Sequence, residues 1–140
     1  MKLEEYEMLP DILSVDELEQ YSQGALTDFS AKNTDKEVFL QILSQLMDRQ
    51  VMTYELLRDE IRDEIDNVLC ELWNTNSYHD VDIILSIVVN LGLKSCFEKI
   101  KDSISQEHHI DSLILHEIQE TIDEIGENIA NPYHDLEKFK

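Results

Sequence analysis

Carboxylates are the chemically capable side chains that this sequence offers in quantity, with 31 Asp and Glu among 140 residues. A di-iron site in a helical protein needs inward-facing Glu residues and Glu-x-x-His pairs on two helices, and no Glu-x-x-His occurs here. The segment His116-Glu117-Ile118-Gln119-Glu120 superficially resembles a zinc-protease motif, but its fifth residue is Glu rather than the required His. We therefore expect His116 and Glu120 to form a solvated contact on one helix face rather than a metal site.

The other sequence motifs that would indicate catalysis are also missing. Cys70 and Cys96 fall on apolar stripes, where a free Cys commonly behaves as a small buried hydrophobe, and the chain contains no Gly-x-Ser-x-Gly. Its 3 glycines are too widely spaced for a phosphate-binding loop. His79, His108 and His109 lie near expected helix starts, and we interpret them as surface polar groups. The sequence thus predicts no catalytic residue, no metal ligand and no cofactor, and indicates that the protein is not an enzyme.

A run of acids without local cations is the most distinctive chemical feature. No Lys or Arg occurs between Lys101 and Lys138. Like charges three or four residues apart destabilise a helix by about 0.2–0.5 kcal/mol per pair, so their retention suggests an external cationic partner, with a merely solvated face as the alternative. The candidate partner-binding residues are the acids of this helix and of an earlier one: Glu117, Glu120, Asp123, Glu124, Glu127, Asp59, Glu60 and Asp63.

The net charge of −20 limits the classes of partner. Such a charge opposes binding to nucleic acid, because phosphates are repelled rather than neutralised, and it opposes binding to anionic membrane surfaces. It favours fast, electrostatically steered association with a basic protein surface. Improved solubility is the alternative explanation for the acidity.

The expected location is the cytoplasm. No apolar run approaches the roughly 20 residues needed to span a bilayer, and the acidic start, Met1-Lys2-Leu3-Glu4-Glu5-Tyr6-Glu7, lacks the basic and then apolar order of a signal peptide. In that reducing compartment we expect Cys70 and Cys96 to stay free thiols, although a disulfide between them is geometrically feasible.

Apolar residues recur at helical spacing through most of the chain. Thr34 and Glu37 suggest a capping box at one helix start, and Thr53 suggests the cap of the next helix. The almost wholly apolar segment 80–91 could form a buried strand, but Gly92 suits a helix C-cap and no second strand is available for pairing. The predicted helices span residues 16–31, 34–50, 53–73, 80–91, 93–104 and 110–129.

These elements predict an all-α fold of five to six antiparallel amphipathic helices, because short connections make successive helices antiparallel neighbours. A helical bundle and a short stack of helical hairpins are both compatible with the pattern. We expect a single helical domain over residues 1–140, with a weakly structured segment at 1–15 and a short tail at 131–140.

One central segment carries a family resemblance. The stretches Leu69-Cys70-Glu71-Leu72-Trp73, His79-Asp80-Val81-Asp82-Ile83-Ile84 and Asn90-Leu91-Gly92-Leu93 resemble small bacterial immunity proteins of polymorphic toxins, which contain HEAT-like helical hairpins. The similarity covers about a quarter of the chain, and helical hairpins share such patterns widely. It implies a short HEAT-like hairpin stack, a cytoplasmic antidote that covers the active site of a basic toxin domain, and no catalytic residue.

The leading expectation is therefore an acidic protein that neutralises a basic partner, and a bacterial toxin is the partner that the resemblance indicates. A helical regulatory or scaffold module shares the same composition and requires no toxic partner. A metal-dependent helical enzyme is the third alternative.

Overall fold

The computed structural model describes residues 2–106, 110–126 and 129. Within these residues the chain forms seven helices and no strand, which confirms the all-α class and is consistent with a helical bundle. No helix in this described part is both long enough and apolar enough to cross a membrane. The sequence predicts a single domain; the chain packs as two compact units, residues 1–65 and 66–140.

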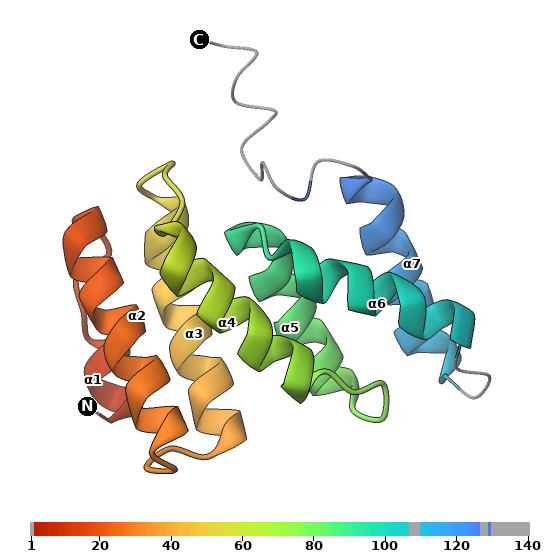
Figure 1. Cartoon of the computed structure of the whole chain (residues 1–140), viewed down its shortest axis with the longest axis horizontal. Coiled ribbons are helices and arrows are strands. Elements are labelled where there is room, and N and C mark those ends of the chain that lie inside the picture. Colours follow the sequence, from red (N-terminus) through yellow and green to blue (C-terminus); the bar gives the residue numbers. More distant parts are fainter. Residues whose placement is uncertain (1, 107–109, 127–128, 130–140) are drawn as a thin grey trace, which may run out of the picture. The chain divides into compact units, whose positions relative to one another are not determined.

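The first unit contains α1 (Leu3–Glu7), α2 (Val15–Ser30), α3 (Lys36–Val51) and the start of α4 (Asp59–Leu72). Helix α3 packs against both α1 and α2, and Figure 1 shows α2 and α3 side by side. The Phe29 ring stacks on the Phe39 ring with centroids 4.2 Å apart. The buried Tyr6 ring meets Tyr21 edge-on at 6.2 Å. The Tyr6 contact holds the short helix α1 within the segment that we expected to be weakly structured.

Arg49 of α3 fastens the N-terminal segment. Its side chain is 5% exposed. The guanidinium donates to the carbonyl oxygens of Pro10 at 2.9 Å, Leu9 at 2.7 Å and Gln45 at 2.9 Å. The planar guanidinium presents five N–H donors in a rigid fork, so one buried cation satisfies the Leu9 and Pro10 carbonyl groups, which lie outside any helix, and also bonds the Gln45 carbonyl of its own helix.

The predicted starts of two helices are wrong, each for a local reason. Helix α3 is capped by Asp35 rather than Thr34, because the Asp35 carboxylate accepts from the Val38 amide at 2.9 Å. Helix α4 begins at Asp59 rather than Thr53. The Thr53 hydroxyl instead donates to the Gln50 carbonyl at 2.7 Å, and Tyr54 takes a left-handed φ of 56°. This turn closes the end of α3 and interrupts the helical path.

The second unit contains the end of α4, α5 (Tyr78–Leu91), α6 (Lys94–Gln106) and α7 (Ser112–Ile125). Helices α5, α6 and α7 contact one another in pairs. The β-branched segment is helical, as predicted, and α5 buries apolar residues on most of its circumference. Gly92 ends α5 with a left-handed φ of 69°, and the Leu93 amide donates back to the Val88 carbonyl at 3.0 Å.

Two buried polar contacts fix α6 within this unit. The Asp66 carboxylate of α4 accepts from the backbone amides of Ser95 at 2.9 Å and Cys96 at 2.7 Å. Near the other end of α6, the Trp73 indole donates to the Ser103 hydroxyl at 3.3 Å. Asp66 thus satisfies free amides at the first turn of α6, where a negative charge is also favoured by the helix dipole.

Replacing Arg49 by Lys is predicted to loosen the N-terminal segment. An ammonium keeps the charge but cannot reproduce the fork of donors, so carbonyl groups near Pro10 lose buried partners at a cost of about 1–3 kcal/mol each. We expect faster hydrogen exchange and proteolysis across residues 2–13 and a lower free energy of unfolding.

Arg58→Lys is the matched control, because the Arg58 side chain is largely exposed. Equal exchange rates in the Arg49→Lys and Arg58→Lys proteins would contradict the anchoring role of Arg49.

Candidate protein-binding surface

The sequence pattern predicts that the acids of α7 all face outward, but in the structure they do not. Glu120, Asp123 and Glu124 are exposed on α7, whereas Glu117 is half-buried. Glu127 lies outside the described residues. Glu117 turns toward α5 because α5 and α7 pack together in the second unit, and this position brings it against side chains of the neighbouring helix.

Glu117 meets Asp82 and Tyr78 of α5. Burial is the main cause that raises the pKa of the Glu117 carboxyl, and a hydrogen bond with the Asp82 carboxyl raises it further, while a hydrogen bond from the Tyr78 hydroxyl lowers it. Two neighbouring carboxyl groups repel each other when both are ionised, and they share a proton when one is neutral. The Glu117 Oε2 atom is buried and makes no hydrogen bond with the described part of the chain.

An open hollow of about 220 Å³ extends along this contact between α5 and α7. Its acidic lining comes from Asp82, Glu117 and Glu124, and its apolar lining from Leu85, Val89 and Ile125. We call the acidic residues of this region, Asp82, Glu117, Glu120 and Glu124, the α5–α7 acidic surface. Its members combine negative charge with a shallow, partly apolar recess, which suits the stem and charged end of a Lys or Arg side chain.

The remaining α7 acids have neutral or titratable neighbours. Glu120 lies 3.6 Å from the His116 imidazole, which is the solvated pair that the spacing predicts. Asp123 accepts a hydrogen bond from the Gln119 amide at 3.1 Å. The local sequence supplies no Lys or Arg to either carboxylate, so the negative charge on this helix is only weakly compensated.

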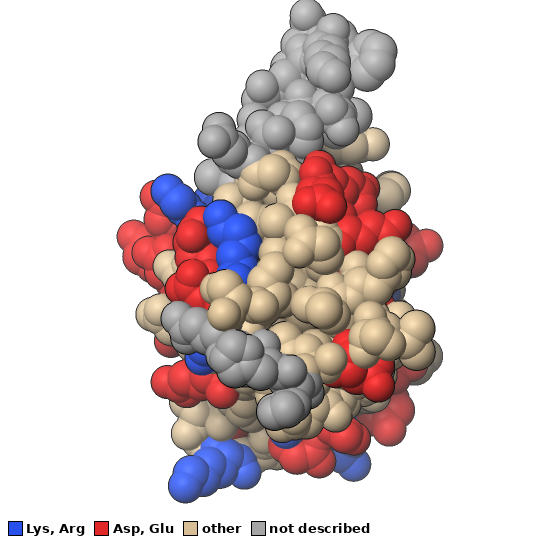
Figure 2. All heavy atoms as spheres, turned by 90° about the vertical axis from the view of Figure 1, so that its right-hand side faces the viewer, with Lys and Arg blue, Asp and Glu red and all other residues tan. Residues whose placement is uncertain are grey.

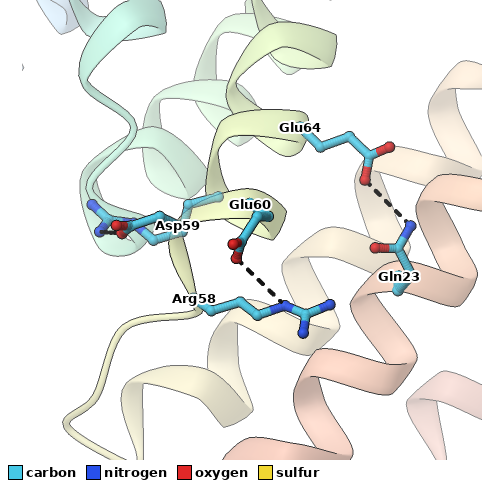
Figure 3. A network of polar contacts seen from close by, with 6 residues as sticks. Gln23, Arg58, Asp59, Glu60 and Glu64 are labelled. Carbon is cyan, nitrogen blue, oxygen red and sulfur yellow. Dashed lines mark hydrogen bonds and ion pairs between the residues drawn. The ribbon is translucent and has the colours of Figure 1, made fainter.

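The predicted acids of α4 lie in the first unit and have cations beside them. Asp59 lies 3.7 Å from Arg62, and Glu60 lies 3.9 Å from Arg58 (Figure 3). Asp63 is exposed on the same helix. Surface ion pairs of this kind contribute little to stability, about 0–1 kcal/mol, but they reduce the local negative potential. Asp59, Glu60 and Asp63 are therefore weaker candidates for binding a cation than the α5–α7 acidic surface.

A larger open hollow of about 660 Å³ lies in the first unit. Asp16, Glu19 and Asp28 contribute acidic groups to its lining, and Arg58 contributes a cation. The hollow is wide and solvent-exposed, and its mixed charge offers less selectivity for a basic group. It does not displace the α5–α7 acidic surface as the best candidate.

Apolar side chains accompany the acidic surface of the second unit. Leu113 is 70% exposed and Leu115 is 39% exposed at the start of α7, and Tyr78 is half exposed at the start of α5. Figure 2 shows a broad area without charged residues on the side of the molecule where α6 and α7 lie, bordered by groups of Asp and Glu and, on the left, also by Lys or Arg. Exposed apolar area with a charged border is typical of protein-binding surfaces.

Helical spacing alone did not identify Asp82 as a member of this surface. Asp82 lies four residues after Tyr78 and therefore on the same face of α5. The missing information was the helix that packs beside that face, which helical spacing alone does not specify.

Glu117→Gln is predicted to stabilise the protein near pH 7 but not near pH 4. Because the folded state raises the pKa of Glu117, this group favours folding below its unfolded pKa, about 4.3, and that stability is lost as the pH rises through the folded pKa. A neutral Gln avoids the loss and still accepts from Tyr78. The measurement is the unfolding temperature of both proteins across this pH range.

Asp123→Asn is the control for that pH series, because it removes an exposed charge from the same helix. A stability difference between wild type and Glu117→Gln that does not change with pH would show that the Glu117 proton is unimportant.

Comparisons of this chain with protein-family models, with curated proteins and with solved structures find no match.

Proposed function

We propose that this protein binds and neutralises a basic protein partner, and that the partner is a bacterial toxin whose cognate immunity protein this is. The α5–α7 acidic surface is the observation that carries the proposal. It joins carboxylates that no Lys or Arg of α7 compensates to the exposed Leu113 within one unit of the fold.

The chemistry of Glu117 supports a cationic partner. Its Oε2 atom is buried without a hydrogen bond from the described residues, beside the Asp82 carboxyl. A Lys or Arg that enters the adjoining hollow would bring a positive charge beside both carboxyls, and a nearby opposite charge favours their ionised form. Binding would favour ionisation of both carboxyls and so remove a repulsion that exists in the free protein.

The net charge of −20 supports fast association with a basic partner. An antidote must reach its target before the target acts, and an acidic field raises association rates with a basic protein by about 10–1000-fold at low salt. The apolar contact of Leu113, which lies four residues before Glu117 on the same face of α7, would then slow dissociation, because buried apolar contacts mainly affect the off-rate.

The test begins with capture of partners by the full-length protein from its native host, at low and at high salt. The proposal predicts a basic protein in near-stoichiometric amount that is lost as salt rises. Expression of that protein alone should arrest growth of a bacterial host, and co-expression of the present chain should restore growth. A captured protein that is harmless alone would instead support the regulatory or scaffold alternative and contradict neutralisation.

Two triple variants locate the surface. Glu117→Gln, Glu120→Gln and Glu124→Gln together remove three charges from α7, and Asp59→Asn, Glu60→Gln and Asp63→Asn remove three from α4. We expect the α7 variant to associate with the captured protein at least about tenfold more slowly, and the α4 variant to behave nearly as wild type. The reverse order would exclude the α5–α7 acidic surface as the binding site.

A further inference from the structure

Three potential metal ligands meet in the interior of the second unit. The carboxylate of Asp66 and the thiols of Cys70 and Cys96 all lie within 4.8 Å of one another. Asp66 and Cys70 are four residues apart on α4, which places them on one helix face, and Cys96 comes from the first turn of α6. This arrangement was not visible in the sequence, where each Cys simply falls on an apolar stripe.

We propose that Asp66, Cys70 and Cys96 form a binding site for a thiophilic divalent cation, of which Zn²⁺ is the biological representative. A donor set of two sulfurs and one carboxylate oxygen suits Zn²⁺ and is poor for Mg²⁺ or Ca²⁺, which prefer oxygen ligands. Three protein ligands leave a fourth tetrahedral position for water.

The geometry requires only small side-chain adjustments. In a tetrahedral zinc site with Zn–S bonds of about 2.3 Å, neighbouring ligand atoms lie about 3.5–3.8 Å apart. The Asp66 carboxylate is held in place by the amides of Ser95 and Cys96, and each of its oxygens keeps a second lone pair for a metal. Such hydrogen bonds to a ligating carboxylate are the outer contacts that orient metal ligands.

Charge balance also favours a divalent cation at this place. Burial raises the pKa of both thiols, so each is protonated at neutral pH. Binding of one Zn²⁺ breaks two S–H bonds, forms two Zn–S bonds and releases two protons to water. The Lys99 ammonium lies close by, where it donates to the Cys70 carbonyl. Two thiolates, one carboxylate and one Zn²⁺ then leave a single negative charge in the site, beside the exposed Lys99 ammonium.

The half-buried Cys70 gives a cation its route to the site, whereas Cys96 and Asp66 are buried. Both thiols are free in this structure. The Asp66 carboxylate within 4.8 Å of both thiols completes a three-ligand set, which suits a metal ion rather than a disulfide.

The test is a titration of the reduced, metal-free full chain with Co²⁺, a spectroscopic substitute for Zn²⁺, in the presence of excess Mg²⁺. Excess Mg²⁺ occupies the exposed carboxylates of this acidic chain. We expect one Co²⁺ per chain, a thiolate-to-cobalt charge-transfer band, strong visible bands of tetrahedral Co²⁺, and loss of all bands when Zn²⁺ is added. Release of about two protons per bound ion should accompany the titration.

Cys70→Ser is the decisive variant, because the half-buried position tolerates a smaller polar group, and circular dichroism checks that the helices persist. We expect its affinity to fall by more than the ~10–100-fold that loss of an outer contact costs. Asp102→Asn, an exposed acid on the same helix as Cys96, should bind the metal as wild type does. Absence of a thiolate band in wild type, or an unchanged band and affinity in folded Cys70→Ser, would overturn the site.

Discussion

The placement of carboxylates is the constraint on which this structure depends. The chain has 31 acids and 11 basic residues, so most carboxylates cannot be paired and must stay in water, and each buried one needs hydrogen-bond donors. The Asp66 carboxylate is held by two backbone amides, and Asp80 accepts from the Asn74 side chain at 3.0 Å. The buried cation Arg49 likewise binds carbonyl groups. Neutral backbone and amide groups therefore stabilise much of the buried charge.

Glu117 differs from these satisfied carboxylates. It is half-buried beside another carboxyl group, and one of its oxygens lacks a hydrogen-bond donor among the described residues. A free protein keeps such an arrangement at some cost in stability. Binding sites commonly carry groups that are satisfied only in the complex, and this is why Glu117 and its neighbours, rather than the paired acids of α4, are the centre of the proposed surface.

Periodicity was sufficient to predict α2 to α7, which carry apolar residues over many turns, but not the short α1. The region 80–91 illustrates this: its β-branched residues favour a strand, but Gly92 and the lack of a pairing partner indicate a helix, which is what forms. Boundaries were less predictable. Thr34 and Thr53 both have cap-forming side chains, and only the three-dimensional structure shows that Asp35 caps α3 and that Thr53 closes a turn.

The candidate sites were predictable only in part, because they depend on which helices become neighbours. Glu120 and Glu124 were identified from the acidic run alone, and both lie on the exposed face of α7. Asp82 and Tyr78 join them only through the packing of α5 against α7. In the same way Cys70 and Cys96 looked like separate core residues, yet α4 and α6 bring them together at Asp66. Spacing along one helix does not contain this information.

In our proposal, the chain itself does not compensate the negative charge of the α5–α7 acidic surface. The most direct measurement is the unfolding temperature at pH 7 as a function of NaCl concentration. Added salt shortens the Debye length from about 30 Å at 0.01 M to about 8 Å at 0.15 M, so it screens repulsion among the carboxylates. We expect an unfolding temperature that rises steadily over this range. An unfolding temperature that stays constant or falls would show that repulsion among the carboxylates does not lower the stability of the folded protein.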